Sequence, residues 1–221
     1  RKSQNTYYDG STQGFQNLVP GISTPVQVIP YGFKAGKWRI GTKKPRSFLT
    51  VALLPNMMRY VLKGADQIVE IAARFPDCTF TIVGFNFDLQ AEIPPNVKLI
   101  SAVPFDELVD IFATHTYYFQ LSISEGHPNA LCEAMMSGCV PIVSDVTSMP
   151  DIVADTGFIV KKRNLDVLQA SMEQALQADT KALGEAARAR VSSLFPFDAR
   201  RASLKQICHD LLAGNPIQLN P

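Results

Sequence analysis

Residues 117–144 read YYFQLSISEGHPNALCEAMMSGCVPIVS, and this stretch decides the fold class. It begins with an apolar run of strand length, 117–122, and ends with a second one, 140–144. Between them a polar loop leads into a helical segment, 130–137, that Gly138 ends. A strand, a helix and a second strand in close succession indicate two parallel strands joined by a crossover helix.

The same alternation runs through most of the chain. We expect further strands at 48–54, 79–84, 97–100 and 157–160, and helices at 65–72, 105–112 and about 165–213, the last with breaks near Gly184 and Phe195. A shorter segment, 26–30, alternates like an edge strand and ends at a proline. This pattern predicts an α/β fold with a doubly wound, Rossmann-like parallel sheet and C-terminal helices.

The bulk composition limits the possible partners. Of 221 residues, 46% are hydrophobic, and 21 Lys and Arg against 20 Asp and Glu give a net charge of +1, so no long-range field attracts nucleic acid. No apolar run has the length of a membrane span. The four cysteines form no C-x-x-C pair and no zinc spacing. We therefore expect a soluble, cytoplasmic protein with reduced thiols and no nucleic-acid partner.

The loop between the two quoted strands is the first candidate site, because ligands of such sheets bind beyond the carboxyl ends of the strands. Pro128 suits the first helical position, which makes His127 the expected cap residue. The free amides of Asn129 and Ala130 would then face outward at the positive end of the helix dipole. This arrangement predicts a site for a phosphate or a similar anion.

Two acidic residues flank this helix start. Glu125 lies in the loop, and Glu133 lies eight residues later inside the helix. A carboxylate accepts hydrogen bonds from two vicinal hydroxyls at once, so the pair suits sugar and ribose hydroxyls on either side of a diphosphate. For Glu133 the alternative is that it only complements the helix dipole.

A second candidate loop, 55–64, follows the strand at 48–54 and carries two cations, Arg59 and Lys63. On their own they would be read as solvated surface charge. Opposite an anion-binding helix start, they become candidates for neutralising a pyrophosphate leaving group.

Together these loops resemble the retaining glycosyltransferases of the GT-B fold, in particular glycosyltransferase family 4, also called glycosyltransferases group 1. The resemblance rests on the Glu-x7-Glu signature from Glu125 to Glu133, within the wording SEGHPNALCEAMMSGCVPIVS. It extends from Ile29-Pro30-Tyr31-Gly32 through Lys63-Gly64 to Gly157-Phe158-Ile159-Val160, and so covers roughly residues 25–175.

The resemblance implies a role for each candidate residue. Glu133 would bind the ribose hydroxyls, Glu125 the transferred sugar, and Arg59 and Lys63 the diphosphate. The donor would lie against Gly126, His127, Pro128, Asn129 and Ala130, with backbone contacts at His127, Asn129 and Ala130. Two features depart from the family pattern: Pro128 stands where many members have glycine, and Thr147-Ser148 stands where the family has Gly-Gly.

The implied activity is transfer of a hexosyl group from a UDP or GDP sugar, with retention, in polysaccharide or glycolipid biosynthesis. We expect no cofactor besides the nucleotide-sugar donor and no metal, since the sequence has no Asp-x-Asp pair. Residues 25–178 would form the nucleotide-sugar-binding half of a GT-B fold, 179–221 helices packing on it, and 1–24 a linker or remnant of an N-terminal acceptor-binding domain missing from this chain. Without that domain we expect the chain to be inactive.

The full-length enzyme would act on a glycan or lipid-linked acceptor, in the cytoplasm or peripherally at the inner membrane surface. Two other function classes stay open. One is a nucleotide-sugar epimerase or a phosphorylase of similar architecture, although no motif marks a lysine for pyridoxal phosphate. The other is a non-catalytic Rossmann-type nucleotide-binding module, although no G-x-G-x-x-G follows a predicted strand. His127 could act as a general base, or as a capping or packing residue.

Overall fold

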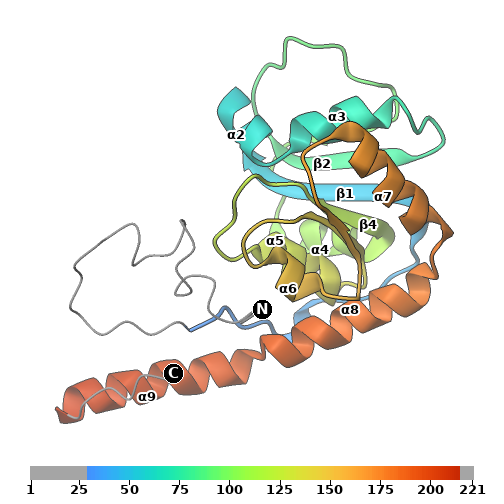
Figure 1. The fold of residues 1–221 in the computed structure, drawn as a ribbon. Coiled ribbons are helices and arrows are strands. Elements are labelled where there is room, and N and C mark those ends of the chain that lie inside the picture. Colours follow the sequence, from blue (N-terminus) through green and yellow to red (C-terminus); the bar gives the residue numbers. More distant parts are fainter. Residues whose placement is uncertain (1–28, 215–221) are drawn as a thin grey trace.

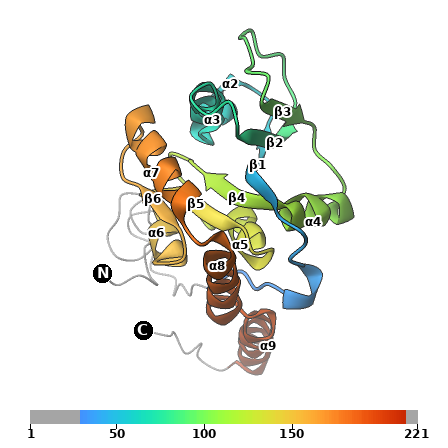
Figure 2. The same ribbon diagram turned by 90° about the vertical axis from the view of Figure 1, so that its right-hand side faces the viewer.

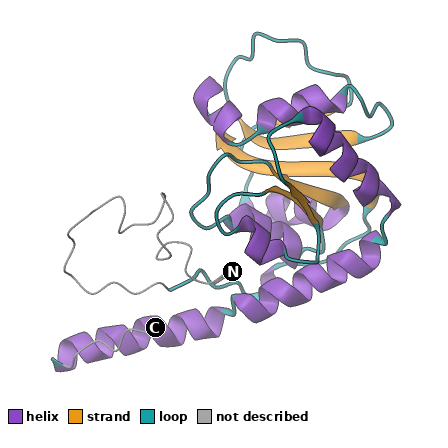
Figure 3. Ribbon diagram, viewed as in Figure 1, coloured by secondary structure: helices purple, strands orange, loops and turns teal. Residues whose placement is uncertain are grey.

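The structure is a computed structural model that describes residues 29–214, and its centre is a six-stranded sheet (Figures 1 and 3). The strands follow the order β3-β2-β1-β4-β5-β6, and all neighbours are parallel. Their bounds are β1 Lys44–Leu54, β2 Thr79–Phe85, β3 Val97–Ile100, β4 His115–Gln120, β5 Val140–Ser144 and β6 Phe158–Val160. The predicted doubly wound, Rossmann-like α/β fold is confirmed.

Helices connect the strands and continue beyond them. They are η1 Ala35–Lys37, α2 Met57–Leu62, α3 Ala65–Ala72, α4 Phe105–Thr114, α5 Asn129–Met136, α6 Met149–Val153, α7 Leu165–Gln177, α8 Thr180–Leu194 and α9 Phe197–Ala213. The last of these, α9, has no buried residue and extends away from the sheet (Figure 1). Within residues 29–214, no helix combines the length and the apolar character needed to cross a membrane.

The sheet is covered on both faces because successive strand residues point to opposite sides. Phe48 packs with α3 and α7 on one face, whereas its neighbour Leu49 packs with α4, α5, α6 and α8 on the other (Figure 2). All six residues of β4 are buried, as expected for a central parallel strand. Stacked rings stabilise the core between the sheet and helices α3 and α7. There the ring centroid of Phe48 lies 4.5 Å from that of Tyr117 and 5.0 Å from that of Phe119.

The strand order reverses between β1 and β4. From β1 the chain continues to β2 and β3 on one side, and from β4 to β5 and β6 on the other. At such a switch point the loops that leave the two strands diverge to opposite faces and open a crevice at the carboxyl ends of the strands, which we call the carboxyl edge. The loops after β1 and β4 are the two that the sequence predicts to carry the site.

The helical region after residue 165 differs from the expectation at one point. Gly184 does not break a helix: it lies inside α8, and the break falls one turn earlier, where the Asp179 side chain caps α8. A Cβ at Gly184 would lie 2.4 Å from the carbonyl oxygen of Gly138. The glycine therefore allows α8 to cross α5 closely. The break expected near Phe195 is confirmed between α8 and α9.

The edge strand expected at 26–30 is absent from the described part of the sheet. Residues 26–28 lie outside the described residues, and Ile29 and Pro30 have no strand structure. Close by, a single parallel bridge joins Phe33 to Pro196, so this segment pairs with the junction of α8 and α9 instead of a sheet edge.

Candidate functional site

The segment after β1, expected to be a loop, contains the short helix α2. Asn56 starts it, because its side-chain oxygen accepts a hydrogen bond from the backbone N–H of Arg59 at 3.0 Å. Arg59 and Lys63 are therefore one helical turn apart and lie on similar sides of α2. Arg59 is exposed, and its side chain makes no hydrogen bond or ion pair within residues 29–214.

A glycine brings the end of α2 onto the end of β4. Gly64 has φ 73°, and a Cβ there would lie 2.2 Å from the carbonyl oxygen of Leu121, so no other residue fits. Next to it, the Ile123 N–H donates to the carbonyl of Leu62 at 2.9 Å. These contacts place Lys63 against the loop that follows β4.

Lys63 and Glu125 form an ion pair across the switch point. Their side chains are 17% and 10% exposed, so the pair is largely shielded from water. Glu125 Oε1 accepts hydrogen bonds from Lys63, from Gln120 Nε2 at 2.9 Å and from Ser122 Oγ at 2.7 Å. Gln120 in turn accepts from the Tyr118 hydroxyl at 3.2 Å. The carboxylate is thus held by a polar network that begins inside the sheet.

Helix α5 begins at Asn129, one residue after Pro128, the expected first helical position. Pro128 is the cap residue, not the first helical residue, and His127 lies outside the helix. The Asn129 N–H turns back to the His127 carbonyl at 2.9 Å. The amides without an acceptor in the described part of the chain are therefore those of Ala130 and Leu131, which corrects the expected pair by one position. A proline cap has no side-chain oxygen to satisfy them.

Glu133 lies inside α5 and forms no ion pair with any of residues 29–214. Burial raises its pKa to about 7. Burial also raises the pKa of Tyr118 well above its ordinary value, and the charges of Glu133 and Glu125 raise it further. Both carboxylates are thus within electrostatic reach of one buried hydroxyl at the end of β4.

His127 packs among aromatic rings. Its ring is stacked on Tyr31, with centroids 5.5 Å apart and planes 10° apart, and meets Phe195 edge-on at 4.9 Å. Burial, and secondarily the charge of Arg200, lower the pKa of His127. This environment favours the packing role over that of a general base. The aromatic partners of His127 lie far from it in sequence. Only apolar residues next to His127 in the sequence could therefore have indicated its packing role.

The loop after β5 shows how this chain replaces the Gly-Gly of the family pattern. Thr147 adopts φ 51°, a backbone conformation that favours glycine, and its Oγ1 is buried without a partner in the described residues. The next hydroxyl, of Ser148, lies 3.5 Å from the carbonyl of Gly126. The loop keeps a backbone suited to glycine although the side chain there is threonine.

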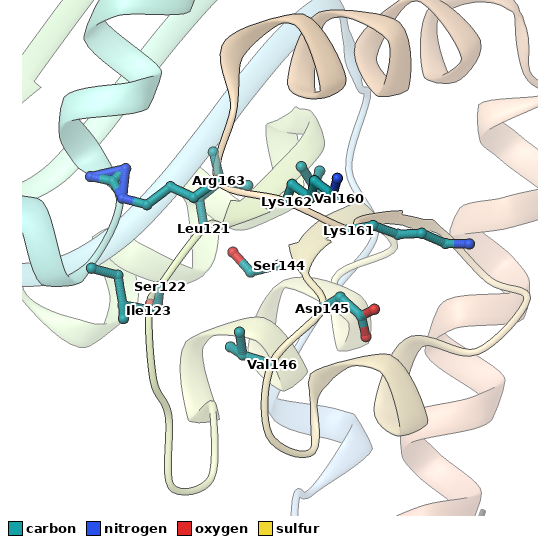
Figure 4. A pocket seen from close by; sticks show the side chains of 10 residues that line it. All are labelled: Leu121, Ser122, Ile123, Ser144, Asp145, Val146, Val160, Lys161, Lys162 and Arg163. Carbon is teal, nitrogen blue, oxygen red and sulfur yellow. The ribbon is translucent and has the colours of Figure 1, made fainter.

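A cavity of about 120 Å³ lies at the ends of β4, β5 and β6 (Figure 4), and Ser122, which donates to Glu125, is one of its lining residues. Its lining residues are Leu121, Ser122, Ile123, Ser144, Asp145, Val146, Val160, Lys161, Lys162 and Arg163. Arg163 points toward α3, where it pairs with Asp66. The consecutive cations Lys161, Lys162 and Arg163 are not among the expected site residues, although they directly follow a predicted strand.

The chain was compared with known proteins. The family model of the glycosyl transferases group 1 matches residues 42–190. The chain belongs to this family. A curated relative of this group 1 chain is the O-antigen chain mannosyltransferase B of Escherichia coli, which is 30% identical over 84 residues, or 38% of this chain and 22% of the mannosyltransferase.

Solved structures share the fold of this group 1 chain. The sucrose-phosphate synthase of Thermosynechococcus elongatus matches with a TM-score of 0.72 and 20% identity over 86% of this chain and 53% of its own. Anabaena HepE in complex with UDP-glucose matches with a TM-score of 0.69 and 15% identity over 85% and 57%. A glycosyltransferase from Rickettsia africae matches with a TM-score of 0.63 and 15% identity over 77% and 48%. This chain thus spans about half the length of these proteins.

Proposed function

We propose that this chain is the donor-binding half of a glycosyltransferase that moves a hexosyl group from a UDP or GDP sugar to an acceptor, with retention. The observation that carries the proposal is the ion pair of Lys63 and Glu125 at the switch point, in the loop that leads to the free amides of α5. Membership of the group 1 family and the likeness to a fold that holds UDP-glucose in HepE support it. Neither an epimerase nor a non-catalytic nucleotide-binding module is favoured by these comparisons.

The proposed chemistry is stabilisation of a leaving nucleoside diphosphate. When the bond between the sugar C1 and the phosphate oxygen breaks, its electron pair stays on the diphosphate, and a new bond forms between C1 and the acceptor oxygen. Lys63, which now pairs with Glu125, can turn its ammonium group to the departing phosphate, and exposed Arg59 one turn earlier can join it. The amides of Ala130 and Leu131 supply uncharged donors at the positive helix end.

Glu125 and Glu133 are proposed to bind opposite ends of the donor. Glu133 would accept hydrogen bonds from the ribose hydroxyls, which would replace the water that its burial excludes. Glu125, fixed by Gln120 and Ser122, would accept from the transferred sugar. No cofactor or metal enters this proposal. The retention of configuration rests on the family resemblance.

The acceptor side of the enzyme is proposed to be a separate, N-terminal domain. The support is that this chain spans 53% and 57% of two solved proteins that share its fold. A glycan or lipid-linked acceptor would bind there, and residues 1–24 would belong to the connection. We place the enzyme in the cytoplasm or at the inner membrane surface, since all four cysteines are unpaired thiols.

Calorimetric titration of the chain with UDP, GDP and ADP sugars tests the proposal. We expect weak binding of one donor, and loss of that binding in Glu133→Ala. The matched control is Glu185→Ala, which removes an exposed carboxylate from α8 and should bind like the wild type. If no nucleotide sugar binds, or if Glu133→Ala binds normally, the donor site is wrong.

Retention is tested separately with the complete enzyme. The anomeric configuration of the product, measured by NMR before it equilibrates, should equal that of the donor sugar. An inverted product would contradict the proposed stereochemistry while leaving the donor site intact.

A further inference from the structure

Two segments that are far apart in sequence cross next to the donor site. We call residues 29–34 the connector and residues 195–200 the junction, since the latter joins α8 to α9. The Phe33 N–H donates to the Phe195 carbonyl at 2.8 Å, and Arg200 Nη1 donates to the carbonyls of Ile29 and Pro30 at 2.8 and 2.7 Å. The two segments are therefore fixed to each other.

Gly32 shows how closely the connector lies on the junction. A Cβ at Gly32 would lie 2.7 Å from the Cα of Phe197, closer than side-chain atoms can approach backbone. Lys34 adds a contact on the far side, with Nζ 4.3 Å from the centre of the Phe197 ring. The connector can therefore shift only together with the start of α9.

A three-layer stack joins this crossing to the site. The Arg200 guanidinium lies 4.7 Å from the centre of the Tyr31 ring, and Tyr31 lies parallel to His127. Phe33 and Phe195 surround the same histidine, at 6.2 and 4.9 Å between ring centroids. The stack thus contains one residue of the junction, one of the connector and one of the loop that follows β4.

His127 lies between two groups of the proposed donor site, so the stack can affect donor binding. Glu125 lies two residues before it, and the first free amide of α5, that of Ala130, lies three residues after it. Proline follows directly and restricts the backbone between the ring and the helix. A displacement of the His127 ring therefore moves the carboxylate and the amides relative to the opposite side of the crevice, where Lys63 lies.

We propose that His127 is a positioning residue, which couples the connector and α9 to the donor site through the stack of Arg200, Tyr31 and His127. The inference rests on the proposed function, because it assumes that the loop 125–130 binds the nucleotide-sugar donor. It goes further in assigning a binding effect to Tyr31 and Arg200, which belong to the connector and the junction.

The test breaks the stack from both sides and measures the affinity for the nucleotide sugar that the wild type binds best. Tyr31→Ala and Arg200→Met remove the distant layers, and His127→Ala removes the layer in the loop. We expect each to weaken binding about 3- to 10-fold, the range that stacked rings and cation–π contacts contribute. His127→Phe, which keeps an aromatic ring, should recover most of the affinity.

Coupling has a further signature. The double variant Tyr31→Ala/His127→Ala should bind no more weakly than His127→Ala alone, because loss of the histidine already removes its contact with Tyr31. The matched control is Phe105→Ala, which removes the aromatic partner of Trp38, 5.4 Å away between ring centroids, on a different element. Its affinity should equal that of the wild type. Thermal unfolding of each variant verifies that it folds, and half-exposed Tyr31 carries the test if His127→Ala does not.

The outcomes separate the two proposals. If Tyr31→Ala and Arg200→Met bind like the wild type while Glu133→Ala loses binding, the coupling is refuted and the donor site stands. Additive losses in the double variant would also overturn the coupling. If the wild type binds no nucleotide sugar, both proposals fall.

Discussion

Two lysines near opposite ends of β1 are both largely buried, yet their partners differ in kind. Lys43, just before the strand, donates to the carbonyls of Phe112 at 3.2 Å and Ser137 at 2.7 Å, and lies 3.5 Å from the Cys139 sulfur. Burial lowers its pKa. Lys63, beyond the other end, pairs with the carboxylate of Glu125. One lysine satisfies backbone groups, and the other satisfies a side chain that a ligand can replace.

The difference follows from the direction of the helices. In a parallel α/β sheet the helices end at the amino edge of the strands and begin at the carboxyl edge. Lys43 therefore meets the carbonyl ends of α4 and α5, where a cation is stabilised by the dipoles. Lys63 lies at the carboxyl edge, where the helices begin, and its partner there is the carboxylate of Glu125. A buried lysine is thus structural at the amino edge of the sheet and available for binding at the carboxyl edge.

The largest effect on activity is expected from a substitution of Glu125, the ion-pair partner of Lys63. Glu125→Gln keeps the size of the side chain but removes the charge that holds Lys63 and the proposed sugar contact. We expect kcat of the complete enzyme to fall by about 10²- to 10³-fold, the scale reported for loss of one transition-state contact. The control is Asp66→Asn, which removes another ion pair at the carboxyl edge, with Arg163. Equal turnover in Glu125→Gln and wild type would remove Glu125 from the mechanism.

The direct test of the comparison exchanges each lysine for methionine. Lys63→Met should weaken donor binding about 10- to 50-fold, because it loses a charge-assisted contact to the diphosphate, and it should also destabilise the fold, because the shielded carboxylate of Glu125 loses its cation. Lys43→Met should lower the free energy of unfolding by about 2–3 kcal/mol and leave the affinity of the folded protein unchanged, because two carbonyls lose their donor. Calorimetry and urea unfolding measure the two effects. The reverse pattern would disprove the distinction between the two edges.

A smaller effect is expected from pH, through Glu133. Ribose hydroxyls donate to the ionised carboxylate, so affinity should rise with pH up to the pKa of about 7 and level off above it. Below pH 7 the dissociation constant should increase up to about 10-fold per pH unit. Glu133→Gln should abolish this dependence, and a wild-type affinity that is constant from pH 5.5 to 8 would contradict it.

The raised pKa of Glu133 also has a consequence for folding. The pKa of Glu133 in the folded protein lies above its ordinary value of 4.5. The contribution of this group to the stability of the folded protein is therefore complete below pH 4.5 and is lost as the pH rises through about 7. The loss amounts to about 3 kcal/mol. Glu133→Gln should therefore raise the melting temperature at pH 8 more than at pH 5, in thermal scans of both proteins.

The smallest expected effect concerns the loop after β5. Thr147→Gly should stabilise the protein by about 0.5–1 kcal/mol, because relief of the positive φ and of the unpaired buried hydroxyl exceeds the entropy that glycine adds to the unfolded chain. Ser148→Gly, at φ −85°, is the matched control and should destabilise. Urea unfolding distinguishes the two signs.

Much of the fold could be predicted because the strands are buried on both faces. The helix at 65–72 and the strand at 140–144 have the expected bounds, since a helical period and a short apolar run are local signals. Helix α2 was missed because six residues are too few for a period, and its cap at Asn56 follows a proline that suggests a loop. Gly184 was misread because a glycine that permits close packing looks like one that ends a helix.

The candidate site, like the fold, was only partly predictable from the sequence. Lys63 and Glu125 were predicted from separate loops, and the structure pairs them, whereas the places of Arg59 and Glu133 in the site stay predictions. The identity of the free amides was off by one residue, because it depends on where Pro128 turns the backbone.

The parallel α/β sheet and the residues that flank its carboxyl edge follow from the amino-acid sequence alone, because burial on both faces and the start of a helix are encoded by a few neighbouring residues. Only the tertiary structure decided what those residues touch. The pairing of Lys63 with Glu125 depends on how closely Gly64 lets two loops approach, and the stack on His127 brings together positions 31, 127 and 200. Contacts between distant segments are set by the packing of the whole core, and no local pattern encodes them.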